Sequence, residues 1–332
     1  MLILGIETSC DETAAAVVED GKRILSNVVA SQVELHRKFW GIVPEIASRK
    51  HLEVIIPIIK ESLSQARIKL KDLDAVAATY GPGLLGSLLV GLTAAKGLAY
   101  FLELPFIGIN HLEAHLYANF LSYSEIIPPL TGLIISGGHT ELVYLSRERK
   151  YEILGTTRDD AVGEAFDKVA RILNLGYPGG PAIEKIAKKG NPQSVDLPLT
   201  HFKNDTLDFS FSGIKTAVLY YVKDLEKKKV SIPTADIAAS FQLKVAQMLS
   251  QNLFKAAYLK KVRKIILGGG VSANLFLRSF LEKEKPQGLE IFFPPLELCT
   301  DNAAMVAACA YSKIREGKSS PLSLDAQPNL GF

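Results

Sequence analysis

The chain has 332 residues, a hydrophobic content of 48% and a formal net charge of +3 from 38 basic and 35 acidic side chains. This length exceeds what one hydrophobic core usually organises, so we expect two domains of ordinary globular composition. The small net charge does not by itself indicate a polyanionic partner, although local runs such as "RIKLK" and "KKVRK" leave room for contacts with nucleic acid.

The three cysteines, Cys10, Cys299 and Cys309, form no CxxC pair. Scattered cysteines in an odd number argue against a disulfide framework and against a thiolate zinc site, so we expect a reducing, cytoplasmic setting. The opening "MLILGIE" lacks the basic leader and the cleavage site of a signal peptide, so none is expected.

The first third of the chain predicts an α/β order. Short apolar runs bounded by turn residues indicate three strands, at 2–7, 13–20 and 22–31. A helix, a strand, a second helix and a further strand should follow, at 44–65, 74–83, 83–102 and 105–110. The stretch 83–102 is long enough to span a membrane, but Lys96 lies inside it and Gly81-Pro82-Gly83 precedes it, so we expect a buried helix and no membrane span.

The same order begins again at residue 130. The pattern predicts two strands about a Gly-Gly turn and then a third strand, over 130–146 and 151–159. Helices and strands follow, with helices at 161–175, 236–259 and 272–284 and strands at 264–270 and 289–295. Two such openings suggest a duplicated domain, and the Pro-, Gly- and Asn-rich stretch 177–202 is expected to be an insertion outside the core.

The stretch "NHLEAHLYANF" carries His111 and His115 one helical turn apart, so both rings can reach one cation. A zinc protease has a glutamate directly after the first histidine, whereas Leu112 occupies that place and Glu113 comes one residue later. Two histidines need a third ligand, and Asp301, directly before a helix, is our candidate from the second lobe, although a carboxylate there is often only a helix cap.

Three glycine-marked or small-residue turns follow strands, "ETSCDET", "ISGGHTE" and "LGGGVSANL", and bare backbone amides in such turns suit phosphates. The third turn satisfies G-x-G-x-x-A, but the acidic residue of a dinucleotide site is not found at the end of the next strand, since Glu290 lies at its beginning. In the first turn, Asp11 and Glu12 are adjacent carboxylates that can orient water or accept a proton, or form a solvated acidic turn.

Eight motifs in order resemble the tRNA N6-adenosine threonylcarbamoyltransferase family, TsaD, also called glycoprotease-like. The motifs, which span nearly the whole chain, are "GIETSCDETAAAVV", "YGPGLLGSLLVGLTAAKGLA", "NHLEAH", "ISGGHTEL", "GEAFDKVARILNLGYPGGP", "FSFSGIKTA", "GGGVSAN" and "DNAAM". The resemblance implies an α/β, actin-like ATPase fold of two duplicated ribonuclease-H-like lobes, with the adenylate substrate or ATP in the cleft. It places the first lobe at 1–128 and the second at 129–332, with a helical and loop insertion at about 161–235 and the C-terminal helix packed back on the first lobe.

The resemblance also implies the reaction. Members transfer the threonylcarbamoyl group of threonylcarbamoyl-AMP to N6 of the adenosine just 3′ of the anticodon in tRNAs that read codons beginning with A. The implied partners are tRNA, a TsaB-like paralogue and a TsaE-like ATPase, with a homodimer as a further option.

Family positions carried onto this chain give the implied site. One Fe²⁺ per subunit, or zinc, would be bound by His111, His115 and Asp301, and Asp11 and Glu12 match the catalytic acidic pair. The implied substrate contacts are Ile134, Ile135, Ser136, Gly137, Gly138, Asp167, Gly180, Glu184, where many members have aspartate, and Asn274. The stretch "FSFSGIKTA", with Lys215, is a candidate tRNA contact or else a packed helix start.

Three alternatives stay open at this point. A metalloprotease fits the paired histidines but not the displaced glutamate. An actin-like ATPase or sugar kinase would share the lobes but would bind magnesium through carboxylates and water. A non-catalytic scaffold similar to TsaB would lack the histidine pair.

Overall fold

The computed structural model describes residues 1–147, 150–199, 202 and 206–332. The chain forms two compact units, the first from 1–126 together with 294–332 and the second from 127–293. Asp301 therefore belongs to the first unit and not to the second lobe, from which we expected it. The physical reason is that the helix after Asp301 packs on the first strand of the first unit.

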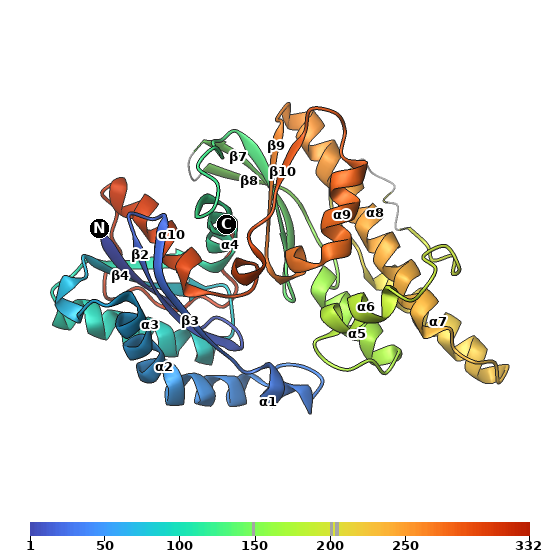
Figure 1. Ribbon diagram of the computed structural model, residues 1–332, viewed down its shortest axis with the longest axis horizontal. Helices are drawn as coiled ribbons and strands as arrows, with labels where there is room; N and C mark the ends of the chain where they lie inside the picture. Colours follow the sequence, from blue (N-terminus) through green and yellow to red (C-terminus); the bar gives the residue numbers. More distant parts are fainter. Residues whose placement is uncertain (148–149, 200–201, 203–205) are drawn as a thin grey trace. The chain divides into compact units, whose positions relative to one another are not determined.

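The first unit follows the predicted order closely (Figure 1). Its strands are β1 (Leu2–Glu7), β2 (Glu12–Glu19), β3 (Arg23–Ser31), β4 (Ala75–Gly81) and β5 (Phe106–Asn110). Its helices are α1 (Val33–Arg37), α2 (Pro44–Ala66), η1 (Leu70–Asp72), α3 (Leu85–Phe101), α4 (His111–Phe120), η3 (Leu296–Leu298) and α10 (Ala303–Arg315). The buried helix expected at 83–102 is confirmed as α3.

Alternation along the strands of this unit sends side chains to two cores. Leu4 and Ile6 of β1 face α2 and α3, while Ile3, the residue before Leu4, faces α4 and α10. Helix α10 comes so close to β1 that a Cβ at Gly5 would lie 2.4 Å from the carbonyl oxygen of Ala303. Small residues on both elements therefore bring the segment around residue 301 against the sheet that carries the histidine helix.

The second unit repeats the strand and helix order. Its strands are β6 (Leu130–Ile135), β7 (Thr140–Arg147), β8 (Lys150–Thr156), β9 (Lys264–Gly268) and β10 (Glu290–Phe292). Its helices are α5 (Val162–Ile172), α6 (Gly179–Ala187), α7 (Ser212–Lys227), α8 (Thr234–Lys260), η2 (Gly270–Ala273) and α9 (Leu275–Glu284).

The two sheets have the same topology. Within the described residues each is five-stranded, with the orders β3-β2-β1-β4-β5 and β8-β7-β6-β9-β10. In both, the first three strands pair antiparallel, and the later two run parallel to the central one. Equal strand order and direction in two consecutive halves confirm the predicted duplication.

The stretch 177–202 was wrongly expected to lie outside the core. It contains α6, and the side chains of Ile183, Ala187, Val195 and Leu197 are buried in the same hydrophobic core as the sheet of the second unit. Pro178 with Gly179 and Gly180 resembled a loop, but Pro and Gly are also tolerated where a helix begins. Residues 200, 201 and 203–205, within or beside this stretch and the insertion expected over 161–235, lie outside the described residues.

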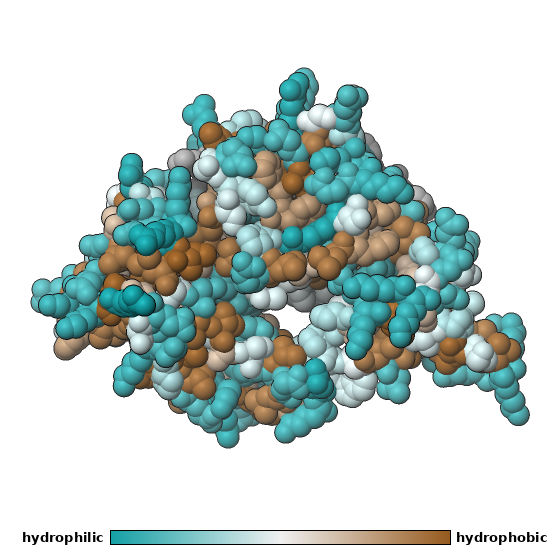
Figure 2. Space-filling view, viewed as in Figure 1, coloured by the Kyte–Doolittle hydropathy of each residue, from teal (hydrophilic) through white to brown (hydrophobic). Residues whose placement is uncertain are grey.

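In the parts of the chain that the structure describes, no helix combines the length and the hydropathy needed to cross a lipid bilayer. The surface in Figure 2 is mainly hydrophilic, with hydrophobic residues distributed among the charged ones.

Candidate active site

Helix α4 presents the two histidines on one face. The side-chain oxygen of Asn110 accepts hydrogen bonds from the backbone N–H groups of Leu112, at 2.8 Å, and Glu113, at 3.2 Å, which fixes where the helix begins. His111 is therefore the first helical residue and His115 lies one turn later, with ring centroids 4.5 Å apart. The local sequence thus determines the spacing of the two rings.

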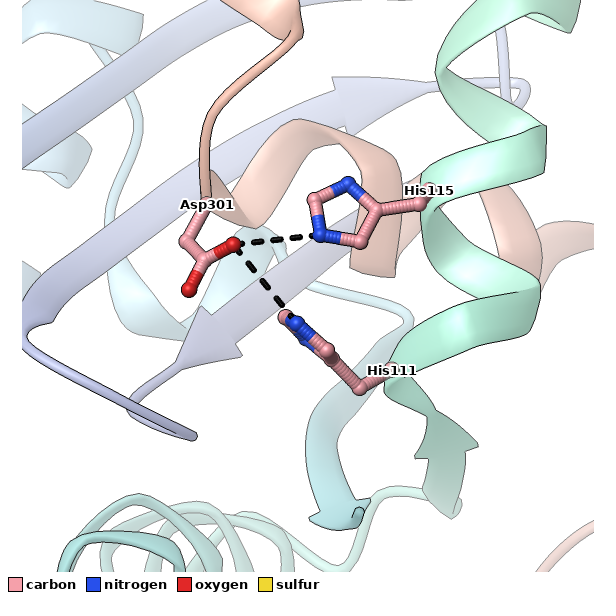
Figure 3. A group of neighbouring side chains, drawn as sticks. All are labelled: His111, His115 and Asp301. Atoms are coloured by element: carbon pink, nitrogen blue, oxygen red, sulfur yellow. Dashed lines mark ion pairs between the residues drawn. The ribbon is translucent and has the colours of Figure 1, made fainter. Parts of the chain in front are cut away.

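Asp301 completes a group of three potential metal ligands (Figure 3). Its Oδ1 lies 3.6 Å from Nε2 of His111 and 3.1 Å from Nε2 of His115. The ligand atoms of the three residues all lie within 4.8 Å of one another, and among the described residues this is the group of His, Cys, Asp and Glu that has such geometry. Ligands at about 2.0–2.2 Å from one ion are at most roughly 4.4 Å apart, so small side-chain adjustments suffice to share an ion.

The surroundings of His115 fit a bound cation. Its side chain is fully buried, and in the described part of the chain neither ring nitrogen makes a hydrogen bond. The 3.1 Å contact of Nε2 with Asp301 is an ion-pair distance without hydrogen-bond geometry. A buried imidazole without hydrogen bonds is costly unless another partner satisfies it. A metal ion shared with Asp301 would bind Nε2 of His115 and so satisfy it. The residues present therefore fit a bound metal ion.

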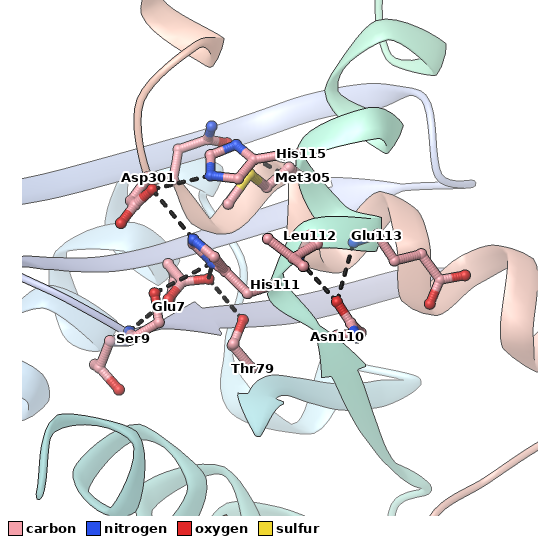
Figure 4. A network of polar contacts seen from close by, with 12 residues as sticks. Glu7, Ser9, Thr79, Asn110, His111, Leu112, Glu113, His115, Asp301 and Met305 are labelled. Carbon is pink, nitrogen blue, oxygen red and sulfur yellow. Dashed lines mark hydrogen bonds and ion pairs between the residues drawn. The ribbon is translucent and has the colours of Figure 1, made fainter. Parts of the chain in front are cut away.

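His111 differs from His115 because a buried carboxylate, that of Glu7, lies 3.1 Å from its Nδ1 (Figure 4). Burial lowers the pKa of His111, but the charges of Asp301 and Glu7 outweigh burial and raise this pKa to about 9. Burial raises the pKa of Glu7, but the charge and hydrogen bond of His111, with the hydroxyl of Thr79, lower it overall. A cation would thus displace a proton from His111, so metal affinity should fall as the pH falls.

The acidic loop lies in the same unit. Asp11 is buried, and its backbone oxygen accepts a hydrogen bond from the N–H of Gln32, while Oε1 of Glu12 accepts one from the hydroxyl of Ser31 at 3.1 Å. Burial, followed by the charges of Asp301 and Asp11, raises the pKa of Glu12 to about 10. Without a cation at Asp301, the carboxyl group of Glu12 therefore holds a proton at neutral pH.

Glu113, the displaced glutamate of the protease pattern, does not face the histidines (Figure 4). Its carboxylate is buried and forms an ion pair at 3.2 Å with Lys313 of α10. A carboxylate held there cannot act on water at the histidine pair, so the geometry argues against the metalloprotease alternative.

The end of β6 and the turn after it contain five of the candidate substrate contacts. Ile134 and Ile135 are fully buried in the strand, so they support the turn from below rather than with exposed side chains. Ser136 closes the turn, because its N–H donates to the oxygen of His139 and its hydroxyl accepts from the N–H of His139. In the described residues, the N–H groups of Gly137 and Gly138 have no acceptor, so they are available to an anion.

Two sets of glycines in the second unit differ in the space around them. A Cβ at Gly163 or Gly179 would lie 2.5–2.6 Å from neighbouring backbone atoms, so the packing requires glycine there. Among the atoms of the described residues, a Cβ at Gly137, Gly138 or Gly180 would meet nothing within 4 Å, and none of the three has a positive φ. The fold therefore does not require these three glycines, whereas the close approach of a ligand would explain them.

Hydrogen bonds connect the remaining candidates in the second unit. Oδ1 of Asp167 on α5 accepts from the N–H of Gly179, which leads into α6, and Oε1 of Glu184 accepts from the N–H of Leu275 at the start of α9. Asn274 caps α9 through its Oδ1, while its Nδ2 donates to Oε1 of Gln242 on α8, at 3.0 Å. Hydrogen bonds thus connect the helices that carry Asp167 in α5, Gly180 and Glu184 in α6 and Asn274 at the cap of α9.

Of the two interpretations of "FSFSGIKTA", the structure supports the packed helix start. Phe209 and Phe211 are 2% and 0% exposed and belong to the core, so they cannot stack on bases. Lys215 forms an ion pair with Asp160 at 2.7 Å. The stretch is the packed start of α7, where Asp159 accepts hydrogen bonds from the N–H groups of Phe211 and Ser212.

Our reading of the sequence missed two groups at the site, Glu7 and Gln242. Glu7 is an acidic residue at the end of an otherwise apolar strand, which is a visible signal, because a charge in a buried position needs a partner. Gln242 lies in the middle of the long helix α8, and no local pattern distinguishes it from other helix positions.

Comparison with solved structures identifies the fold. HypF in a phosphate- and nucleotide-bound form superimposes with a TM-score of 0.62 at 14% identity, covering 94% of this chain and 46% of that chain. Component A of the (R)-2-hydroxyglutaryl-CoA dehydratase of Acidaminococcus fermentans gives a TM-score of 0.56 at 17% identity, covering 95% and 99% of the two chains. At these identities the likeness shows the fold alone, and it confirms the expected actin-like ATPase architecture.

Comparison with curated relatives identifies the family. The proteins named tRNA N6-adenosine threonylcarbamoyltransferase from Clostridium botulinum and Clostridium perfringens are 54% and 52% identical, each over 99% of this chain and 97% of the relative. The family model TsaD, tRNA N6-adenosine threonylcarbamoyltransferase, matches residues 23–308. The chain therefore belongs to the tRNA N6-adenosine threonylcarbamoyltransferase family.

Proposed function

We propose that this enzyme forms N6-threonylcarbamoyladenosine in tRNA with the help of a metal ion bound by His111, His115 and Asp301. The acyl donor is threonylcarbamoyl-AMP, and the acceptor is N6 of the adenosine just 3′ of the anticodon in tRNAs that read codons beginning with A. The observation that carries the metal assignment is the convergence of both Nε2 atoms on Oδ1 of Asp301.

The reaction sets clear demands on the residues. N6 of adenine is a weak nucleophile because its lone pair is delocalised into the ring. A bond forms between N6 and the carbamoyl carbon, the bond from that carbon to the phosphate oxygen breaks, AMP leaves, and N6 loses a proton. When bound, the metal supplies Lewis-acid chemistry by polarising an acyl or phosphate oxygen. His111, His115 and Asp301 have the task of holding it in one place.

Proton transfer is assigned to the acidic loop. Asp11 and Glu12 are neighbours in sequence and share the unit of the metal ligands. Because the hydroxyl of Ser31 donates a hydrogen bond to the carboxyl group of Glu12, we assign the base that takes the proton from N6 to Asp11. Glu12 then supports that carboxylate or donates to the leaving group.

The second unit is proposed to bind the adenylate. The amides of Gly137 and Gly138 suit the phosphate, with Ser136 closing the turn and Ile134 and Ile135 supporting it. Asp167 suits the ribose hydroxyls, and Gly180, Glu184 and Asn274 shape the adenosine pocket. The open space at Gly180 supports this assignment, since a side chain would otherwise be tolerated there.

The metal and partners follow from the same proposal. Two imidazoles and one carboxylate with an open position suit Fe²⁺ or Zn²⁺, and we propose one Fe²⁺ per subunit with zinc as the alternative. The target base lies in an anticodon loop, where unstacked bases can enter a pocket. A TsaB-like paralogue and a TsaE-like ATPase are the proposed protein partners, a homodimer is a further option, and the cytoplasm is the proposed location.

Reconstitution tests the proposal directly. The metal-loaded protein, its partners, threonylcarbamoyl-AMP and unmodified tRNA are incubated, and the nucleosides are analysed by mass spectrometry. We expect the modified adenosine with the wild type and none with His111→Ala. Absence of product under conditions where a relative is active would refute the proposal, and metal-dependent cleavage of unfolded proteins by the wild type alone would favour a protease.

A further inference from the structure

The feature that the reaction does not explain is Glu7. This residue ends β1, and its side chain is 0% exposed. An ionised carboxylate is costly to bury unless hydrogen bonds and a cation compensate it. Three residues from three parts of the chain contact it: Ser9 of the following loop, Thr79 of β4 and His111 of α4 (Figure 4). Such a set of contacts indicates a built arrangement rather than an accidental one.

The donors around Glu7 determine which atoms carry hydrogens. The N–H of Ser9 donates to Oε1 at 2.6 Å, and the hydroxyl of Thr79 donates to Oε2 at 2.6 Å. A carboxylate that accepts from both sides is the ionised form, which has only acceptors to offer to a third partner. Nδ1 of His111, 3.1 Å from Oε2, must therefore carry a hydrogen and donate it.

The tautomer of His111 follows from this contact. With the hydrogen on Nδ1, the lone pair of the neutral ring lies on Nε2, the atom that faces Oδ1 of Asp301 at 3.6 Å. The hydroxyl of Ser9 lies 3.1 Å from the same Nδ1, so it can share the hydrogen without changing the tautomer. His115 has no such support, because in the described residues its Nδ1 makes no hydrogen bond.

We propose that Glu7 is a positioning residue that holds His111 in the Nδ1–H tautomer and aims its Nε2 at the metal position beside Asp301, with Thr79 holding Glu7 in turn. This inference rests on the proposed function, because it presupposes a metal at the His111, His115 and Asp301 group. Partners of this kind orient ligating histidines in other metal sites, and their loss typically weakens metal affinity by about 10–100-fold.

The test measures Zn²⁺ and Co²⁺ affinity of the full-length protein by competition with a chromophoric chelator. We expect Glu7→Gln, which keeps the size but removes the charge, to weaken binding by about 10–100-fold. Thr79→Val removes one hydrogen bond to Glu7 and should weaken binding by roughly 2–10-fold. The Co²⁺ absorption spectrum of Glu7→Gln should also change, because one nitrogen ligand is no longer held in place.

Glu113→Gln is the matched control. Glu113 is also a buried glutamate, on the helix that carries the histidines, but its ion pair with Lys313 lies away from them. Its variant should bind Zn²⁺ as the wild type does. A double-mutant cycle separates positioning from general damage: in a His111→Ala background, Glu7→Gln should have no further effect on Zn²⁺ affinity, whereas an effect of equal size would show that Glu7 does not act through His111.

The possible outcomes distinguish a failure of this inference from a failure of the proposed metal-dependent function. Wild-type Zn²⁺ affinity in Glu7→Gln, together with weak binding in His111→Ala, would overturn the role of Glu7 and leave the metal centre intact. Equal Zn²⁺ affinity in wild type and His111→Ala would instead refute the proposed metal centre itself. If Glu7→Gln does not fold, Thr79→Val decides, and wild-type affinity in that variant would overturn the inference.

Discussion

The proposed metal group of the first unit and the proposed substrate-binding turn of the second unit are built from different parts of the polypeptide. The metal group uses buried side chains from distant segments, since Glu7 and His111 are 104 residues apart. The turn after β6 instead offers backbone N–H groups of adjacent glycines with open space above them. Removing a side chain should therefore disable the first region, whereas adding one should disable the second.

The largest effect is expected for the metal ligands. His115→Ala and Asp301→Ala each remove one of the three proposed ligands, and a metal bound there would contribute several kcal/mol of transition-state stabilisation, so product formation should fall by roughly 10³-fold or more. The measurement is modified adenosine per tRNA, with bound metal quantified in parallel. Tyr117→Phe, on the same helix and bonded to Ser312, is the control and should retain activity. Full activity in a metal-free His115→Ala variant would show that the reaction does not depend on the proposed metal group.

The acidic loop comes next, because its two carboxyl groups differ in environment. Without a cation at Asp301 the pKa of Glu12 is raised to about 10, and the proposed base is Asp11, so Glu12→Gln should lower kcat/KM by no more than ~10-fold. Asp11→Asn removes the assigned base and should lower kcat/KM by about 10²–10⁴-fold. Rates measured at pH 7 decide between them, and the reverse order would assign the base to Glu12.

A smaller effect is expected when a methyl group is added to the turn of the second unit. Gly137→Ala meets no neighbouring atom, so stability should be unchanged while kcat/KM falls by about 10-fold through a raised KM for the adenylate. Gly163→Ala would place its Cβ 2.6 Å from the oxygen of Ser136 and should cost about 1–3 kcal/mol in the free energy of unfolding. Urea unfolding and steady-state kinetics on both variants separate the two kinds of glycine; unchanged kinetics in Gly137→Ala would remove this turn from the site.

Much of the fold was predictable because strand and helix patterns are local. Short apolar runs bounded by turn residues predicted the strands of both sheets, the long apolar stretch 83–102 predicted α3, and the repeated order of elements predicted the duplication. Helix α6 was missed because Pro178 precedes it and its first two residues are glycines, although Ile183 and Ala187 show the spacing of a buried helix face. Local breaker residues outweighed a weak periodic signal there.

The candidate site was predictable only where the spacing of residues in the sequence or the family motifs indicated it. The histidine pair is visible because one helix carries both residues. The partnership of Glu7, Thr79 and His111 is not visible, because it depends on strand pairing and on where α4 begins. The burial of Phe209 and Phe211 was not predictable either, because exposure cannot be read from residue type. Both are core residues.

The smallest expected effect concerns the start of α7. There the carboxylate of Asp159 accepts hydrogen bonds from the backbone N–H groups of Phe211 and Ser212. Burial raises the pKa of Asp159, but hydrogen bonds from Ser210 and Ser212 and from the N–H of Phe211 lower it overall. A group whose pKa is lower in the folded state stabilises the fold above its unfolded pKa, about 3.9, and this contribution is lost as the pH falls through the folded-state value.

Asp159→Ala should therefore cost about 1 kcal/mol at pH 7, as loss of a helix cap does, and the difference from wild type should shrink as the pH falls below 4. Urea unfolding at a series of pH values measures this difference. Asp196→Ala, at a fully exposed carboxylate of the same unit, should show little change at any pH. If the destabilisation by Asp159→Ala stayed constant at pH values well below 4, the charge of Asp159 would not be what holds α7 in place. The start of α7 would then depend on backbone geometry, as the glycine turn of the same unit does.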